Sequence, residues 1–93
     1  MALLEDDEVR AALGGLDGWE MEGGEIVREV RFEGFRAAIA FVVRVAFEAE
    51  AADHHPDIDI RWARVRLALS THSQGGITMG DIEMARTIDA LVP

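Results

Sequence analysis

The stretch that decides the fold runs from Glu33 to Ser70 and reads EGFRAAIAFVVRVAFEAEAADHHPDIDIRWARVRLALS. Its first part, Glu33 to Ala52, predicts the clearest helix of the chain, because apolar residues recur in it at helical spacing. The stripe that we expect to face the core comprises Phe35, Ala38, Ile39, Val42, Val43, Ala46 and Ala49. Pro56 restricts the residue before it to extended geometry, so the helix must end before the histidine pair.

The second part of this stretch, Asp57 to Ser70, predicts strands. Its apolar residues change phase: Ile58 and Ile60 have one parity, and Val65, Leu67 and Leu69 have the other. A turn or bulge near Trp62-Ala63 would explain the change, although no glycine or asparagine marks it. This half of the chain therefore reads as a helix followed by two strands.

Upstream of the long helix, Trp19 to Glu22 and Ile26 to Phe32 alternate like two strands of a hairpin. Gly23-Gly24 between them is a two-residue turn signal, because both glycines tolerate a positive φ. Asp6 or Asp7 can cap a first helix, which Gly14-Gly15 should end.

Downstream, Thr71 to Ile77 reads as a loop, and Thr78 begins a last helix with Asp81 in an acidic variant of the capping box. The whole order is α-β-β-α-β-β-α, with no repeats or linkers. We expect one α+β domain over residues 1–93, with a four-stranded antiparallel sheet and helices packed on one face.

Composition narrows the possible functions. The formal net charge of −9 disfavours binding to the phosphate backbone of nucleic acids. The absence of cysteine excludes disulfides and thiolate metal sites and fits a reducing cytoplasm. We see neither a secretory leader nor an apolar run long enough to cross a membrane. All nine basic residues are arginine, and lysine, asparagine and tyrosine are absent, which suggests a GC-rich, bacterial genome.

The residues suited to chemistry lie between Glu50 and Asp81. The chain has three histidines, and His54, His55 and His72 all fall where we expect a helix or strand to end. Imidazole is the side chain that, unperturbed, gains and loses a proton near neutral pH. The ends of packed elements are also where functional sites usually gather.

The spacing of these residues resembles the signature of the pterin-4a-carbinolamine dehydratases. The pattern is Glu50-Ala-Ala-Asp-His-His-Pro56, five residues, Trp62, nine residues, His72, eight residues and Asp81. The flanks agree as well: Phe32-Glu-Gly-Phe35, Leu69-Ser-Thr-His72 and Gly75-Gly-Ile-Thr78. Trp62 stands where tyrosine is frequent in the family, and the resemblance extends from about Trp19 to Ala90.

The resemblance implies a specific reaction: dehydration of 4a-hydroxytetrahydropterin, made by aromatic amino-acid hydroxylases, to quinonoid dihydropterin and water. It implies substrate binding by Asp53, His54, His55, Ser70, Thr71, His72 and Ser73. It also implies a sheet of strand order 1-2-4-3 and a homodimer or homotetramer. No redox change occurs, so neither nicotinamide nor flavin is required, and pterin is the substrate rather than a cofactor. We also expect no metal, because thiols are missing and the histidine pair is poorly placed to share one.

The chemistry is consistent with the residues present, because loss of hydroxide needs an acid and loss of the N5 proton needs a base. We assign the acid and base to His54 and His72, in an order that stays open, and expect His55 to hold the substrate. Glu50 and Asp81 are supporting residues. Either carboxylate has a plainer interpretation, Glu50 as a solvated helix end and Asp81 as a first-turn residue that favours the helix dipole.

Two other classes of function are compatible with the sequence. The first is a non-catalytic dimerisation, assembly or transcriptional cofactor module, a role that some members of the resembling family have. The second is a zinc enzyme that uses His54, His55, His72 and an acid. Neighbouring side chains in an extended segment point in opposite directions, so His54 and His55 cannot easily share a metal.

Overall fold

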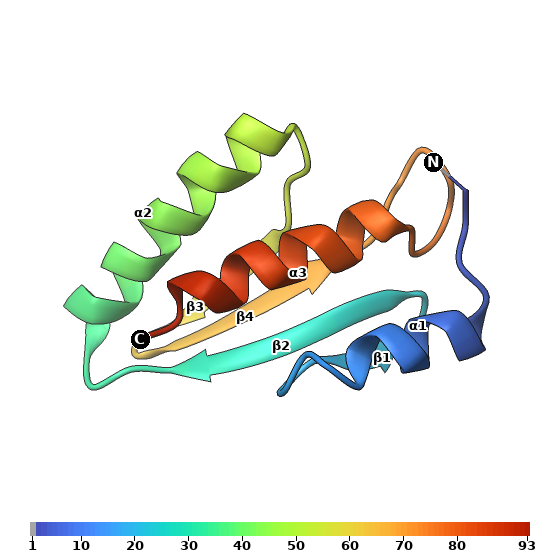
Figure 1. Cartoon of the computed structure of the whole chain (residues 1–93). Coiled ribbons are helices and arrows are strands. Elements are labelled where there is room, and N and C mark those ends of the chain that lie inside the picture. Colours follow the sequence, from blue (N-terminus) through green and yellow to red (C-terminus); the bar gives the residue numbers. More distant parts are fainter. Residues whose placement is uncertain (1) are drawn as a thin grey trace.

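The computed structural model describes residues 2–93, which form three helices and one four-stranded sheet (Figure 1). The elements are α1 (Asp6–Leu13), β1 (Glu20–Glu22), β2 (Glu25–Arg31), α2 (Phe35–Ala52), β3 (Asp57–Arg61), β4 (Arg64–Leu69) and α3 (Met79–Leu91). This is the expected α-β-β-α-β-β-α order of an α+β fold. None of the helices in the described part is long and apolar enough to span a bilayer.

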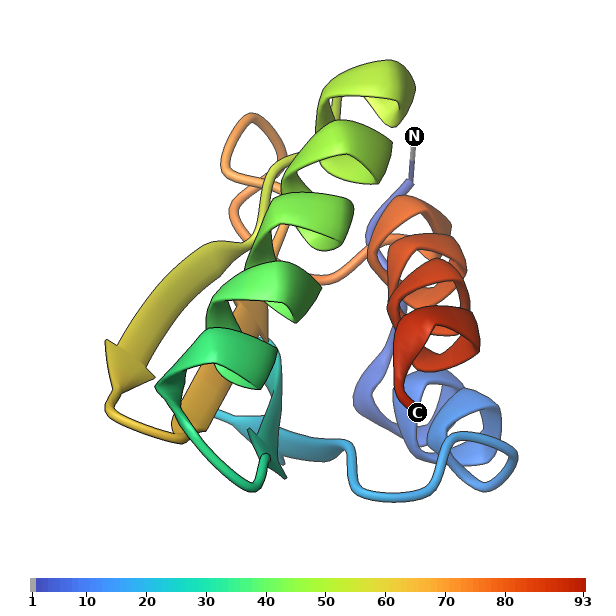
Figure 2. The same cartoon turned by 90° about the vertical axis from the view of Figure 1, so that its left-hand side faces the viewer.

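The sheet has the strand order β1-β2-β4-β3, and every neighbouring pair is antiparallel. Because β4 lies between β2 and β3, the hairpin after α2 returns to the centre of the sheet. The helices lie on one face, and Figure 2 shows α2 and α3 side by side over the strands. The expected strand order and layering are confirmed.

Both predicted turns are present. Gly23 and Gly24 have φ values of 54° and 80° and join β1 to β2. Trp62 also has a positive φ, 53°, and forms the β3–β4 turn together with Ala63. A bulky residue rarely adopts this left-handed geometry, which explains why the sequence alone marked this turn only by a change of phase.

The prediction of which residues of α2 face the core is wrong in part. The buried residues of this helix are Ala38, Phe41, Val45 and Ala49, whereas Phe35 and Val43 are 53% and 46% exposed. Of the other expected core positions, Ile39 and Val42 are half-buried and Ala46 is exposed. Apolar side chains nearly surround this helix, so the periodicity could not decide which side would face the sheet.

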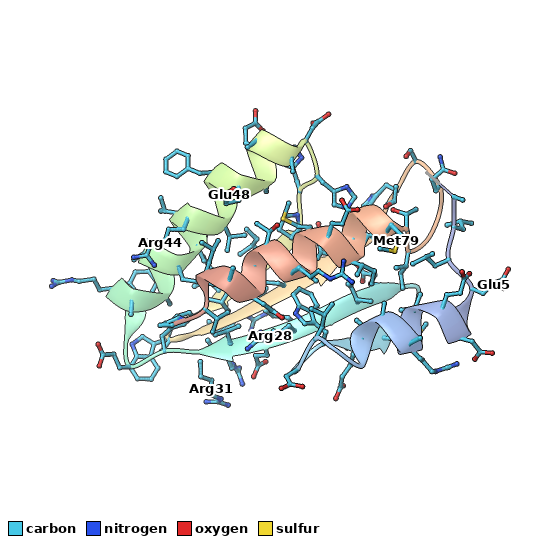
Figure 3. The ribbon with its side chains drawn as sticks, viewed as in Figure 1. Glu5, Arg28, Arg31, Arg44, Glu48 and Met79 are labelled. Carbon is cyan, nitrogen blue, oxygen red and sulfur yellow. The ribbon has the colours of Figure 1, made fainter. Side chains whose placement is uncertain are left out.

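One further boundary differs from the expectation. Glu5, rather than Asp6 or Asp7, precedes the first turn of α1, and its backbone N–H donates to Glu8 Oε1 at 2.8 Å. The end of α1 at Gly14 is as expected. Asp89 of α3 joins segments that are far apart in the sequence, because it accepts from Trp19 Nε1 at 2.8 Å and from Arg28 of β2 at 2.5 Å. Arg28 is labelled in Figure 3.

Candidate active site

The candidate site lies where α2 ends, β4 ends and α3 begins. Asp53 ends α2 in the left-handed region, with φ 51° and ψ 43°. The next backbone N–H, that of His54, donates back to Ala49 O at 3.0 Å. This bond reverses the chain in the manner of a Schellman motif, although an aspartate stands where glycine is usual. The reversal directs His54 towards the start of α3.

His54 forms the central contact of the site. Its Nε2 lies 2.5 Å from Asp81 Oδ1, a residue 27 positions later in the sequence. The His54 side chain is only 16% exposed and Asp81 is fully buried. Because a carboxylate can only accept, Nε2 carries the proton in this contact.

The second carboxylate oxygen of Asp81 also accepts hydrogen bonds. This oxygen, Oδ2, accepts from Thr71 Oγ1 and from the Thr78 backbone N–H, both at 2.9 Å. The two threonine hydroxyls are themselves 2.7 Å apart. A buried carboxylate is costly unless hydrogen bonds satisfy it, and these contacts do so. Asp81 therefore completes the capping box of α3, in which Thr78 is the N-cap, and is also a rigid support for the His54 ring.

The other nitrogen of His54 faces open space. Its Nδ1 has no partner among residues 2–93, and no buried side-chain nitrogen or oxygen in that range is left unpaired. An unpaired nitrogen on a mostly buried ring must therefore be accessible to solvent. With the proton fixed on Nε2 by Asp81, Nδ1 is available to accept a proton from a bound molecule.

His55 points away from this network. Its Nε2 lies 2.8 Å from Glu50 Oε1, and the two side chains are 56% and 81% exposed. The adjacent histidines thus contact different helices, α3 for His54 and α2 for His55. Within residues 2–93, no three histidine, cysteine, aspartate or glutamate side chains gather closely enough to hold a metal ion.

A shallow pocket of about 310 Å³ opens over these residues. It is lined by Asp53, His54, His55, Asp57, Ser70, Thr71, His72 and Ser73. His72 and Ser73 enter it from the loop after β4, and both are exposed. The pocket thus presents three imidazoles, two carboxylates and three hydroxyls to one small volume.

The structure brings the residues selected from the sequence together. The seven expected binding residues all line the pocket, Glu50 contacts His55 and Asp81 contacts His54. Sequence reasoning missed one lining residue: Asp57 also lines the pocket, and its place directly after Pro56 could have suggested it. The expected capping box of Thr78 and Asp81 is present, and the Thr78 backbone N–H thereby supports the carboxylate that holds His54.

Comparison with known proteins identifies the family of this chain. A family model described as pterin 4 alpha carbinolamine dehydratase matches residues 2–91. A protein of Mycobacteroides abscessus, provisionally named a pterin-4-alpha-carbinolamine dehydratase, is 54% identical over 92 residues, which cover 99% of this chain and 98% of that protein.

Two solved structures share the fold. A transcriptional coactivator/pterin dehydratase from Brucella melitensis superposes with a TM-score of 0.93 at 39% identity, covering 98% of this chain and 99% of that one. A pterin dehydratase-like RuBisCO assembly factor of the alpha-carboxysome reaches a TM-score of 0.70 at 20% identity, over 81% of this chain and 89% of its own, which shows the shared fold alone. From the family model and the full-length relative, this chain belongs to the pterin-4-alpha-carbinolamine dehydratase family.

Proposed function

We propose that this protein dehydrates 4a-hydroxytetrahydropterin to quinonoid dihydropterin and water by histidine acid and base catalysis. The observation that carries the proposal is the pocket in which three histidines converge while a buried carboxylate fixes the proton of one of them. An aromatic amino-acid hydroxylase would supply the substrate in the cytoplasm, and the reaction would return the pterin to the tetrahydropterin cycle. Neither a metal nor an organic cofactor takes part.

The reaction needs two proton transfers. An acid protonates the hydroxyl on carbon 4a, which leaves as water, and a base removes the proton from N5. The electron pair of the N5–H bond becomes the second bond between carbon 4a and N5. His54 Nδ1 and the His72 ring are the two groups in the pocket suited to these transfers, because imidazole exchanges protons near neutral pH.

The remaining polar groups would hold the pterin ring. The amide and amino edge of a pterin offers both donors and acceptors. Ser70 and Ser73 line the pocket with hydroxyls that can do either, and Asp53 lines it with an acceptor. Thr71 also lines the pocket, but its hydroxyl donates to Asp81. His55, kept in place by Glu50, contributes a further ring at the rim.

The deciding experiment is an assay of chemically generated 4a-hydroxytetrahydropterin with the purified protein. We expect His54→Ala and His72→Ala to lower turnover by about 10²- to 10⁴-fold, the usual contribution of a proton-transfer group. Gln74→Ala is the matched control, because Gln74 is exposed on the same loop as His72 and lines no part of the pocket. Near-normal turnover in both histidine variants would overturn these roles.

The same assay tests the proposed absence of a metal. Turnover should persist after exhaustive chelation, and the purified protein should contain no stoichiometric metal. A tightly held zinc whose removal abolishes turnover would instead favour a metal enzyme.

A second candidate function is an interaction module on the same fold. It is favoured by the exposed apolar side chains of α2, of which Phe47 is 72% exposed. It also fits the description of the Brucella melitensis structure as a coactivator as well as a dehydratase. Full turnover by the wild-type protein would show that this role is at most additional.

A further inference from the structure

A second hollow adjoins the pocket of the histidines. It has a volume of about 420 Å³ and is formed by two glycine pairs, Gly23–Gly24 and Gly75–Gly76, together with Glu25. It also shares Ser70 and His72 with the first pocket, so the His72 side chain stands between the two spaces. We call this hollow the glycine lobe. Apart from Ser70 and His72, the residues that line it have no role in the proposed dehydration.

Backbone forms most of the wall of the glycine lobe. A Cβ atom placed on Gly24 or on Gly75 would meet no atom within 4 Å, so the space in front of these residues is open. The β1–β2 turn and the loop after β4 therefore approach each other without side chains to fill the gap between them. Such a surface offers room and backbone hydrogen-bonding groups rather than a shape that selects one ligand.

The position of His72 indicates which part of a pterin would reach the glycine lobe. In the reacting ring, carbon 4a is bonded to N5, and N5 is bonded to carbon 6. His72 acts either on the hydroxyl oxygen of carbon 4a, which is three bonds from carbon 6, or on N5, which is bonded to carbon 6. A substituent on carbon 6 therefore leaves the ring beside His72, where the glycine lobe begins.

Charge then restricts the substituent. Glu25 carries the only charged side chain, besides the titratable His72, among the residues that line the lobe. Its carboxylate has no hydrogen bond or ion pair with any residue from 2 to 93, so no neighbouring cation neutralises it. The whole chain adds a formal net charge of −9. An anionic substituent would be repelled, whereas hydroxyl groups could donate to the carboxylate.

We infer that the glycine lobe is the subsite for the carbon 6 substituent and that Glu25 makes it selective for neutral, hydroxylated chains over anionic ones. This inference rests on the proposed dehydration of pterins. It predicts a broad tolerance for the length of the substituent, because glycine backbone forms most of the walls, combined with discrimination against its negative charge.

The test compares two substrates that differ at carbon 6 alone, one with a neutral, hydroxylated chain and one with a chain of similar length that ends in a carboxylate. The readout is the ratio of their kcat/KM values within each variant, at low salt. We expect Glu25→Gln to shift this ratio towards the anionic substrate by about 2- to 5-fold, the scale of one solvent-screened charge pair. Glu25→Lys should shift it further, to about 10-fold, and added salt should reduce both shifts.

Glu20→Gln and Glu20→Lys are the matched controls, because Glu20 lies exposed on the same hairpin and lines neither space. They change the net charge equally and should leave the ratio as in the wild type. A ratio that responds equally to substitutions at both positions, or to neither, would overturn the inference.

Failure of the inference and failure of the proposed function give different results. If the wild-type protein turns over neither substrate, the proposed dehydration fails, and the same ratio is then measured as the Kd values of the corresponding 7,8-dihydropterins. If turnover is normal and the ratio ignores the charge at position 25, only the subsite is wrong.

Discussion

Asp81 is the residue whose chemistry is most constrained by its surroundings. One oxygen accepts from His54, and the other accepts from Thr71 and from the backbone of Thr78. Asp81→Asn preserves the shape but places an NH₂ group opposite His54 or opposite the two donors of the threonines. The arrangement that keeps the threonine bonds turns the amide NH₂ towards Nε2. His54 must then carry its proton on Nδ1, the nitrogen that faces the pocket.

We therefore expect Asp81→Asn to lower turnover by about 10²- to 10⁴-fold while the chain stays folded, because the ring nitrogen facing the pocket can no longer accept a proton. ¹⁵N NMR of the His54 ring should show the proton move from Nε2 to Nδ1. Asp89→Asn is the control, since Asp89 lies on the same helix but bonds Trp19 and Arg28 instead. Normal turnover with an unchanged tautomer would contradict this positioning role.

At the scale of elements, the β3–β4 hairpin contains an unfavourable turn. Trp62 has a φ of 53° and is 73% exposed, so its ring gains little burial to offset the left-handed geometry. We expect Trp62→Asn to raise the free energy of unfolding by about 1 kcal/mol, because asparagine tolerates this geometry better. Urea unfolding measures the change.

Trp62→Ala completes this test, because alanine removes the ring but keeps the cost of the turn. It should leave both stability and turnover nearly unchanged, as Trp62 does not line the pocket of the histidines. A marked loss of turnover in either variant would show that the aromatic ring contacts the substrate after all.

At the scale of the whole molecule, two surfaces remain uncovered. Phe35, Val43 and Phe47 on α2 are 53%, 46% and 72% exposed. With the half-buried Ile39, they recur every four residues and so form one apolar stripe along the outside of the helix. The strands β1 and β3 also leave the two edges of the sheet without a partner strand among residues 2–93. For a chain of 93 residues this is much surface to leave in water.

We expect the protein to be a homodimer or a tetramer built from dimers, with each site formed within one subunit. In sedimentation at micromolar concentration, the double substitution Val43→Glu with Phe47→Glu should reduce the assembly, because a charge on the stripe opposes burial. Ala11→Glu adds charge to an exposed position of α1 and is the control. A fully active wild-type monomer would show that the stripe has another purpose.

The sequence by itself determined the order of elements, both turns and the start of α3. These features depend on local restrictions that act within a few residues: the extended geometry before Pro56, the tolerance of Gly23-Gly24 for positive φ, and the cap between Thr78 and Asp81. The family resemblance, carried by the spacing of the histidines, is confirmed by the comparisons.

Only the tertiary structure decided which side of α2 is buried, that His54 meets Asp81, and that two glycine pairs border one hollow. The periodicity of α2 predicted a stripe that in large part lies outside, because apolar residues occur nearly all round the helix and the pattern has no preferred side. The contact of His54 with Asp81 joins residues 27 apart in the sequence. Such a contact depends on how α3 packs against the end of α2, and no rule that acts along the chain alone specifies that packing.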